Sequence, residues 1–390
     1  MVKIGLERLA EHPDLLARTG HLGLLYNQAS VDSCLRAAPE VIAEAFPGKL
    51  VKLFGPQHGV CGTEQDNMDE TAHSVHPALG LPIHSLYSET RRPLPHMLDE
   101  VDTVLVDIQD VGTRVYTFAT TVLYLMEACA AERKRLVILD RPNPINGKDI
   151  EGNLLEPDFA SFVGPYPIPM RHGLTLGELM TLYNQVHGIG CRLDVIRMEG
   201  WQRDDYFDQT GLPWVLPSPN MPLLDTAIVY PGQVILEGCN LSEGRGTTRP
   251  FELFGAPYLH HAAVIENLED QAVIGAVLRQ TAFRPTFNKW ANEACQGFQI
   301  HVTARSMYRP YRATLALLAA INKTHPNEFG WSSPPYEYVH DRLPVDVITG
   351  SSKVRLDLEQ GRSVLDLERE WVDDLRAFDR LRSRFFLYPP

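Results

Sequence analysis

Residues 103–139 read TVLVDIQDVGTRVYTFATTVLYLMEACAAERKRLVIL, and this stretch decides the fold. It begins and ends with short apolar runs, Thr103–Ile108 and Leu136–Leu139, which are typical of buried parallel strands. Residues 115–133 between them lack Gly and Pro and carry apolar side chains at helical spacing: Phe118, Val122, Leu125, Met126 and Cys129. The order strand, helix, strand predicts a doubly wound α/β domain with a parallel sheet.

The sequence on either side extends this pattern. Further strands are predicted at residues 21–26, 50–54 and 193–198, and a helix begins at Thr175. In residues 210–232 the Pro spacing argues against a regular helix. From about residue 258 the pattern predicts a largely helical segment at 260–281, a strand at 297–302, a helix at 311–323 and an amphipathic closing helix at 364–386. We therefore predict an α/β domain over residues 1–235 and a smaller α+β domain over residues 236–390.

Composition and charge exclude several classes of protein. The 390 residues are 44% hydrophobic and 22% charged, which is enough to bury a large core. The net charge of -13, without any Lys/Arg run, argues against a general nucleic-acid binder. The N-terminus lacks the apolar segment of a signal peptide and no run is long enough to cross a bilayer, so we expect a cytoplasmic protein without membrane insertion. The six cysteines show no CxxC spacing, which favours reduced, structural thiols.

Polar, Gly- and Pro-rich segments follow three of the predicted strands. They are GPQHGVCGTEQDNMDE after Phe54, QDVGTRVYT after Ile108 and DRPNPINGKDIEGN after Leu139. The carboxyl ends of parallel strands meet at one edge of a sheet, so we expect a crevice lined by His58, Glu64, Asp66, Asp107, Asp110, Arg114, Asp140, Arg141 and Asn143. Each also has an ordinary structural alternative: capping a turn, forming an ion pair or binding a backbone carbonyl.

A second polar segment, LEGCNLSEGRGTTRPFELFGAP at residues 236–257, combines carboxylates and arginines with three glycines. This composition predicts an ordered polar loop, and a solvated surface loop is its alternative. Arg171 and His172 precede the helix at Thr175, where backbone N–H groups favour a carboxylate ligand. Trp214, Asn220 and Tyr230 are interpreted as a wall on which a sugar stacks, or as packing between domains.

Common catalytic motifs are absent from the sequence. It contains no GxGxxG after a strand, no GxxxxGK[ST], no HExxH and no GxSxG. No cofactor and no metal is therefore predicted. A crevice rich in carboxylates, with Arg, Asn, His and Tyr, suits a polyhydroxylated ligand and proton transfer at a glycosidic bond.

Six of these segments, in order, resemble the successive motifs of a bacterial family long described as a domain of unknown function. They include FGPQHGVCGTEQDNM, VLVDIQDVGTRVYTF, YPIPMRHGLTLGEL and LEGCNLSEGRGTTRPFELFGAP, and the resemblance covers essentially the whole chain. Characterised members are exo-β-N-acetylmuramidases of the NamZ type. The resemblance implies a Rossmann-like domain, a smaller auxiliary domain, a cleft between them, and release of N-acetylmuramic acid from the non-reducing ends of peptidoglycan fragments. The implied partner is a small carbohydrate, and no oligomeric state is implied.

One departure from the family pattern concerns Gln57. Many members carry Glu in a PEHG motif where this chain has PQHG, and an amide cannot act as a general acid or nucleophile. Glu64, seven residues later in the same loop, is the replacement that we predict. The resemblance then suggests Glu64 and Glu243 as the two carboxylates, Asp107 and Asp110 as alternates, and His58 as a proton-transfer partner.

The remaining predicted contacts are to the substrate. Tyr116 and Asn240 are expected to bind hydroxyl or acetamido groups, and Arg245, Arg249 or Arg171 to bind the lactyl carboxylate through a bidentate guanidinium contact. Gln57, Arg114, Asp140, Asn143, His172 and Asn220 complete the predicted substrate-binding set. Two other hypotheses remain open: a muropeptide-binding protein without turnover, and a metal-dependent phosphohydrolase using Asp107, Asp110 and Asp140.

Overall fold

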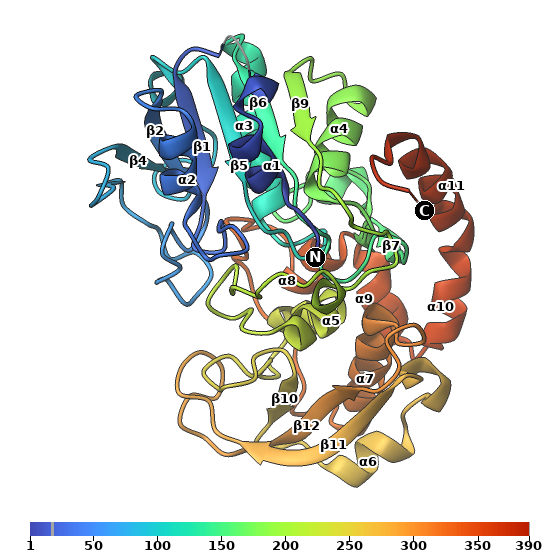
Figure 1. The fold of residues 1–390 in the computed structure, drawn as a ribbon. Helices are drawn as coiled ribbons and strands as arrows, with labels where there is room; N and C mark the ends of the chain where they lie inside the picture. The colour runs from blue at the N-terminus through green and yellow to red at the C-terminus, as the bar shows by residue number, and fades with distance from the viewer. Residues whose placement is uncertain (17–18, 390) are drawn as a thin grey trace.

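A seven-stranded sheet, mostly parallel, forms the first half of the protein (Figure 1). The computed structural model describes residues 1–16 and 19–389. The strands, in their order across the sheet, are β3 (Ser74–Val75), β4 (Pro82–Ser85), β2 (Leu50–Gly55), β1 (Leu22–Tyr26), β5 (Thr103–Asp107), β6 (Arg135–Leu139) and β9 (Arg192–Ile196). Only β3 runs antiparallel to its neighbour. The chain order reverses between β1 and β5, so the polar loops beyond the strand ends open a crevice there.

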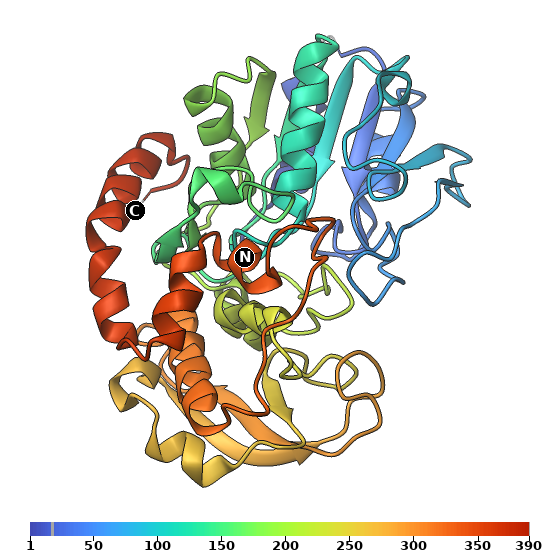
Figure 2. The same ribbon diagram turned by 180° about the vertical axis from the view of Figure 1, so that it is seen from behind.

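Helices cover both faces of this sheet. The helices α1 (Gly5–Glu11) and α2 (Ala38–Ala45) lie on one face, and α3 (Phe118–Ala131) and α4 (Leu176–Val186) lie on the other, as the two opposite views show (Figures 1 and 2). Side chains of a strand alternate between the faces, so Leu24 packs with the first pair and Leu25 with the second. The Thr175 hydroxyl caps α4 by accepting from the Glu178 N–H. Apolar residues therefore fill two separate layers.

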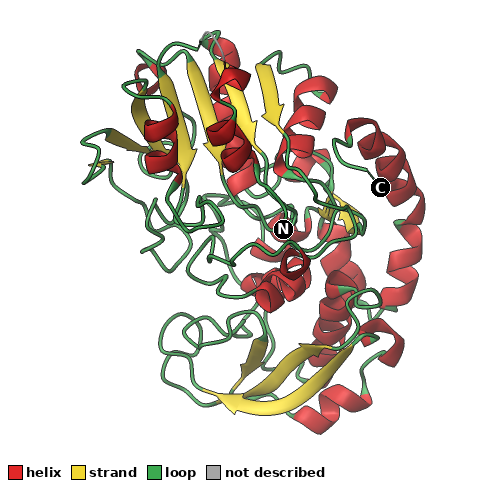
Figure 3. Ribbon diagram, viewed as in Figure 1, coloured by secondary structure: helices red, strands yellow, loops and turns green. Residues whose placement is uncertain are grey.

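The second half of the chain forms a smaller unit around an antiparallel sheet of β10 (Leu253–Ala256), β12 (Cys295–Val302) and β11 (Ala276–Phe283) (Figure 3). Its helices are α5 (Leu224–Gln233), α6 (His261–Glu266), α7 (Pro310–Thr324), α8 (Pro344–Thr349), α9 (Ser352–Glu359), α10 (Val364–Glu370) and α11 (Val372–Arg382). Gly232 allows α5 to lie close against α7, because a Cβ there would stand 1.9 Å from the Pro310 carbonyl oxygen.

Two smaller groups of elements complete the description. A two-stranded sheet joins β7 (Glu151–Leu154) and β8 (Pro169–Arg171). Short 3₁₀ helices are η1 (Pro13–Leu16), η2 (Pro95–Leu98), η3 (Pro157–Phe159), η4 (Phe207–Gln209), η5 (Val234–Gly238), η6 (Asp270–Val273) and η7 (Ser383–Phe385). Within residues 1–16 and 19–389, every helix is too short or too polar to cross a lipid bilayer.

The C-terminal segment returns to the first unit. Helices α10 and α11 run up the side of the molecule, from the three-stranded sheet toward α4 (Figure 1). The Tyr388 hydroxyl then donates to the Asp140 carboxylate at 2.6 Å, and the Leu387 N–H donates to Glu178 at 2.8 Å. The last residues therefore fasten the second unit to the carboxyl end of β6.

The predicted doubly wound α/β fold with a smaller α+β unit is confirmed, as are the strands at 103–108 and 136–139 and the helix between them. Two predictions are wrong. Residues 260–281 are not largely helical, since α6 ends at Glu266 and β11 pairs along β12. Residues 210–232 do contain a helix, because the prolines at 213, 217, 219 and 222 lie before the start of α5. Helix α5 itself contains Pro231, and burial against α7 stabilises the helix despite that proline. The predicted closing helix at 364–386 is divided into α10 and α11 at Trp371.

Candidate active site

A pocket lies where the loops beyond the sheet meet the second unit. Residues from both halves of the chain line it: Gln57, His58, Asn67, Val115, Tyr116, Thr117, Phe118, Val163, Ser218, Asn220, Met221, Tyr230, Glu237, Arg245, Phe251, Tyr336 and Glu337. Gln57 and His58 follow β2, and Tyr116 lies in the loop between β5 and α3. The pocket thus lies beyond the carboxyl ends of the strands, as the doubly wound topology predicts.

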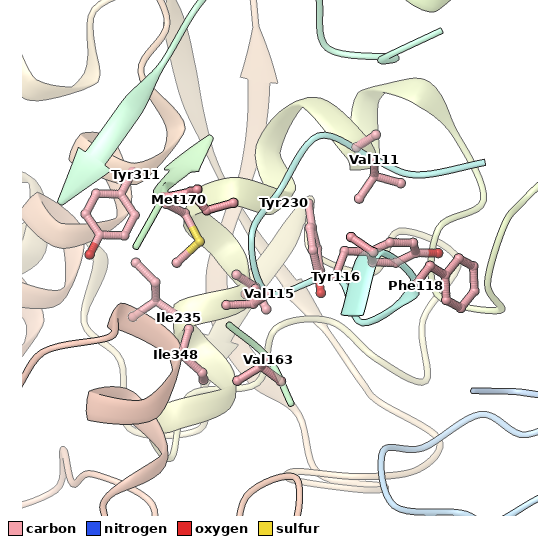
Figure 4. Packing of buried hydrophobic residues seen from close by; sticks show 14 of the residues in the cluster. Val111, Val115, Tyr116, Phe118, Val163, Met170, Tyr230, Ile235, Tyr311 and Ile348 are labelled. Atoms are coloured by element: carbon pink, nitrogen blue, oxygen red, sulfur yellow. The ribbon is translucent and has the colours of Figure 1, made fainter. Parts of the chain in front are cut away.

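Aromatic and aliphatic side chains form one wall of the pocket. The ring of Tyr230 stands edge-on to that of Tyr116, with centroids 5.9 Å apart, and to that of Phe251 at 4.9 Å. Val115 and Val163 pack beside them in the buried cluster that joins the two units (Figure 4). These contacts hold rigid ring faces next to the polar groups of the pocket.

Glu237 is the first carboxylate in the pocket, and it comes from η5. It accepts from Arg245 Nη2 at 2.7 Å, from Asn67 Nδ2 at 2.9 Å and from the Tyr336 hydroxyl at 2.6 Å. Arg245 Nε in turn lies 3.2 Å from a Glu243 oxygen. A guanidinium and two neutral donors therefore surround Glu237, and the contact with Arg245 is a charge-assisted hydrogen bond.

Glu337 is the second carboxylate in the pocket. Its Oε1 accepts from Gln57 Nε2 at 3.0 Å, and its Oε2 accepts from the Tyr87 hydroxyl at 2.7 Å. Burial raises the pKa of Glu337 above its usual range; the bonds from Tyr87 and Gln57 oppose this, and the charge of Glu237 adds to it. A carboxyl group with a raised pKa next to a charged carboxylate is the arrangement by which glycosidases separate acid from nucleophile or base.

Backbone strain accompanies Glu337. Glu337 and Tyr338 are the two central residues of a tight turn in which Tyr336 and Val339 exchange backbone hydrogen bonds of 3.0 and 2.9 Å. Their φ angles are 43° and 65°, a left-handed conformation that large side chains rarely adopt. Such positions cost about 1–3 kcal/mol each and concentrate at functional sites. The turn directs both Tyr336 and Glu337 into the pocket.

His58 lies at the base of the loop that carries Asn67. Its Nδ1 is 2.7 Å from the backbone carbonyl of Glu64, which fixes the ring. Burial, and secondarily the charge of Arg245, lower the pKa of His58 to about 4. The imidazole is therefore neutral near pH 7.

Five of the predicted catalytic and substrate-binding side chains line the pocket: Gln57, His58, Tyr116, Asn220 and Arg245. Asn220 donates to the Gln65 carbonyl at 2.9 Å, and the Arg245 guanidinium pairs with Glu237 and Glu243. Tyr230, named with Asn220, also lines it, whereas Trp214 packs edge-on against Phe207.

The two carboxylates selected first, Glu64 and Glu243, are not among the lining residues. The Glu64 carboxylate accepts from Thr63 at 3.2 Å, and it is the Glu64 backbone that contacts His58. Glu243 is buried behind Arg245 and pairs with Lys289 Nζ at 2.9 Å. Because both of its oxygens pair with cations, Glu243 has a structural role.

The three aspartates at the strand ends do not meet one another. Asp107 is wholly buried in a bidentate pair with Arg141, with N–O distances of 2.6 and 2.7 Å. Asp110 accepts from the Gly112 N–H at 2.7 Å. Asp140 accepts from Thr175, Gly177 and Tyr388. Within residues 1–16 and 19–389, no three His, Cys, Asp or Glu side chains are placed to hold a metal ion.

The other basic side chains selected from the sequence stabilise the fold instead of facing the pocket. Arg114 donates to four backbone carbonyls, those of Asn153, Ile168, Ile348 and Thr349, at 2.7–3.2 Å. Arg171 is buried and donates to the Ile145 carbonyl, and its guanidinium lies 3.4 Å from the Asp149 carboxylate. The ring of His172 accepts from the Leu174 N–H at 3.2 Å.

The remaining selected side chains also have structural partners. Asn143 donates to the Leu174 carbonyl at 2.9 Å, and Asn240 donates to that of Glu328 at 2.7 Å. Arg249 pairs with Glu252 at 3.2 Å from a side chain that is 42% exposed. None of the three lines the pocket.

Three residues of this pocket, Glu237, Tyr336 and Glu337, have no role among the predictions from the sequence. Glu237 lies within the polar segment at 236–257, where Glu243 was selected instead. Tyr336 and Glu337 belong to the segment PPYEYV at residues 334–339, which matches none of the catalytic motifs considered from the sequence. A glutamate between two tyrosines is the local feature of this segment that is consistent with a sugar-binding site.

Comparisons with known proteins agree with this architecture. Two family models match, described as exo-β-N-acetylmuramidase NamZ, N-terminal, over residues 22–225 and C-terminal, over residues 228–388. The chain is 39% identical over 387 residues to the peptidoglycan β-N-acetylmuramidase NamZ of Bacillus subtilis (strain 168), covering 99% of this chain and 91% of that protein.

Two solved structures share the fold, both of DUF1343 family proteins from Bacteroides fragilis. One is 32% identical with a TM-score of 0.88, and the other is 26% identical with a TM-score of 0.78. Each comparison covers 100% of this chain and 99% of the other.

Proposed function

The chain belongs to the NamZ family of exo-β-N-acetylmuramidases, and from this premise we propose that it hydrolyses the terminal β-N-acetylmuramyl bond of peptidoglycan fragments in the pocket of Glu237 and Glu337. One observation supports this location above the others. Two carboxylates with different partners, the buried Glu337 and the partly buried Glu237, share one pocket, and hydroxyl, amide and aromatic groups surround them. This is the set of groups that glycoside hydrolysis uses.

Glu337 is the proton donor in this proposal. Its proton passes to the oxygen of the leaving sugar as the bond from that oxygen to the anomeric carbon breaks. Glu237, held by Arg245, stabilises the positive charge that develops at the anomeric carbon, or attacks it. Water supplies the hydroxyl group of the released N-acetylmuramic acid, and its second proton restores Glu337. Both carboxylates thus have a defined role with no cofactor.

The pocket also suits an N-acetylated sugar. Tyr116, Tyr230 and Phe251 provide ring faces and edges, and Asn220 and Ser218 provide groups for sugar hydroxyls or the acetamido group. Of the three arginines selected for the lactyl carboxylate, Arg245 is the one that lines the pocket. We therefore assign binding of the lactyl carboxylate to Arg245 as a second role. The edge of the guanidinium that we assign to this contact carries Nη1, which lies 3.2 Å from the Gln65 carbonyl oxygen.

The experiment that tests this function is release of 4-nitrophenol from its β-N-acetylmuramide, with the β-N-acetylglucosaminide as control. We expect turnover of the muramide, loss of turnover in E337Q and in E237Q, and no effect of EDTA. Turnover of neither sugar by a folded protein would favour the muropeptide-binding hypothesis. Inhibition by EDTA would favour a metal-dependent reaction.

A further inference from the structure

We propose that Tyr338, braced by Arg91, forms the platform on which the leaving saccharide stacks, directly beyond the bond that is cleaved. This inference rests on the proposed function, because it takes Glu337 as the group that protonates the leaving oxygen. It assigns a binding site for a second pyranose to residues outside the pocket lining.

The position of Tyr338 follows from its neighbours. It is the residue after Glu337 in the strained turn, and its ring stands edge-on to that of Tyr87 with centroids 6.3 Å apart. Tyr87 itself donates to Glu337 and accepts from the Met68 N–H at 3.1 Å. Tyr338 is therefore on the rim of the pocket, next to the oxygens that would deliver the proton.

The ring of Tyr338 is held in place and yet exposed. The Arg91 guanidinium carbon lies 3.6 Å from the ring centroid and so covers one face. Glu70 fixes both partners, accepting from Arg91 at 3.2 Å and from the Tyr338 hydroxyl at 3.3 Å. Nevertheless, 39% of Tyr338 is exposed. Because Arg91 covers one face of this partly exposed ring, we assign the stacking surface to the opposite face.

The position of the cleaved bond identifies the ligand of Tyr338 as the first pyranose of the leaving saccharide. Cleavage at the terminal bond leaves the saccharide on the Glu337 side of the broken bond, so its first pyranose has to lie beside the turn that carries Tyr338. The C–H face of a pyranose is apolar and stacks on an aromatic ring, which gains contact area at low entropic cost when the ring is already fixed. A tyrosine held with positive φ, at a cost in strain, is such a ring.

The kinetic test compares two substrates of the full-length protein: the disaccharide N-acetylmuramyl-β-1,4-N-acetylglucosamine and methyl β-N-acetylmuramide, which lacks the second sugar. Nitrophenyl glycosides are unsuitable, because their aromatic group would itself stack on Tyr338. The readout is the ratio of the two kcat/KM values, which cancels any general damage to the adjacent Glu337. We expect Y338A to lower this ratio roughly three- to tenfold, the size of one aromatic contact, and Y338F to retain it.

A matched pair of arginine variants tests the brace. Arg91 and Arg92 are consecutive and each covers a tyrosine ring, but Arg92 lies over Tyr124, 3.7 Å from its centroid and away from the pocket lining. R91M is expected to lower the ratio and R92M to leave it unchanged. An unchanged ratio in Y338A, or equal effects of R91M and R92M, would overturn the proposal.

A binding measurement decides the question even if the protein has no turnover. The disaccharide and N-acetylmuramic acid are titrated calorimetrically into E337Q and into E337Q/Y338A. We expect the disaccharide alone to bind more weakly to the double variant. If the disaccharide binds E337Q no more tightly than N-acetylmuramic acid does, there is no second-sugar site at Tyr338. Failure of the proposed hydrolysis is seen separately, as absence of turnover of both substrates by the native chain, and absence of N-acetylmuramic acid binding in both variants would mean that the pocket is not the sugar site.

Discussion

Gln57 and Glu337 are 280 positions apart in the chain and are joined by a buried hydrogen bond of 3.0 Å between Gln57 Nε2 and Glu337 Oε1. The Thr117 hydroxyl donates to the other end of the amide, Gln57 Oε1, at 2.5 Å. Rotation of the amide by 180° would reverse both bonds, so that a protonated Glu337 donates and Thr117 accepts. Gln57 can therefore hold Glu337 in either protonation state, which a proton donor needs during one catalytic cycle.

Substitutions of Gln57 are expected to move the pH profile. The Gln57 N–H stabilises ionised Glu337 and so lowers its pKa, against the larger effect of burial. In Q57M that donor is lost and the pKa of Glu337 rises. Activity requires protonated Glu337, so the alkaline limb of kcat/KM against pH moves to higher pH while the maximum falls roughly tenfold or more through lost orientation.

The control for this experiment is Q57E, which places a carboxyl group beside Glu337 without changing the length of the side chain. Two carboxyl groups about 3 Å apart titrate as a pair, so one apparent pKa rises and the alkaline limb again moves upward. Glu237, Arg91 and Tyr87 also influence Glu337 and are unchanged in both variants. A fall in activity with no movement of either limb would mean that Gln57 has only a packing role.

Glutamate-to-glutamine substitutions distinguish the pocket carboxylates, Glu237 and Glu337, from Glu64. E237Q and E337Q keep the side-chain shape but remove the charge or the proton, and we expect kcat to fall about 10²–10⁴-fold in each. E64Q, which changes an acid outside the pocket lining, is expected to retain turnover within about threefold. Loss of turnover in E64Q with retention in E337Q would restore the assignment made from the sequence.

E243Q is expected to affect stability more than chemistry. Glu243 is buried between Arg245 and Lys289, and removing its charge leaves Lys289 without its carboxylate partner and Arg245 with Glu237 alone. Breaking such a pair costs on the order of 2–4 kcal/mol. Urea unfolding of E243Q measures this cost, and kcat at a temperature where E243Q remains folded should stay near that of the native chain. A native unfolding midpoint would contradict this prediction.

Arg114 is expected to be essential for folding and not for specificity. Its guanidinium joins carbonyls of the β7 and β8 segments to those at the end of α8, so R114M would remove a donor from four buried carbonyls. The carbonyls of Ile168 and Thr349 would each keep one other donor. Burial lowers the pKa of Arg114 to about 10, so it stays charged at neutral pH. Each carbonyl left without a donor costs about 1 kcal/mol or more, and we expect R114M to unfold at a markedly lower denaturant concentration than R114K. A native midpoint for R114M would refute this role.

The sheet was predictable because its signals are local. The apolar runs of β5 and β6 and the helical spacing of α3 each lie within a few residues, and they specify a right-handed strand–helix–strand unit. Helix α5 was missed because most of its residues are buried, which removes the polar face that periodicity detects, and because it contains Pro231.

The active site was less predictable because its carboxylates come from distant segments. Nothing in the sequence near Gln57 indicates that Glu337 lies against it, since tertiary packing alone brings them together. Glu237 and Glu243 stand six residues apart in one polar segment, and both contact Arg245. Only the fold determines that Glu237 is on the pocket side and Glu243 on the Lys289 side.

The contact between Asp140 and Tyr388 predicts how stability changes with pH. Burial raises the pKa of Asp140 to about 6, while the bonds from Tyr388, Thr175 and Gly177 oppose that rise. The folded protein thus holds this proton more tightly than the unfolded chain, whose Asp titrates near 3.8. The contribution of Asp140 to stability is therefore greatest below pH 4, declines as pH rises from about 4 to 6, and is constant above that range.

Two variants at this contact test the sign and the cause. Urea unfolding at pH 4.5, 5.5 and 7 should show a decline in the native protein that D140N lacks, with a difference on the order of 2–3 kcal/mol across the range. Y388F removes a donor to ionised Asp140, so the pKa rises further and the decline extends to higher pH. If D140N and the native chain lose stability in parallel between pH 4.5 and 7, Asp140 is already ionised in the folded protein over this range. The Tyr388 hydroxyl would then stabilise Asp140 as a charged hydrogen-bond acceptor.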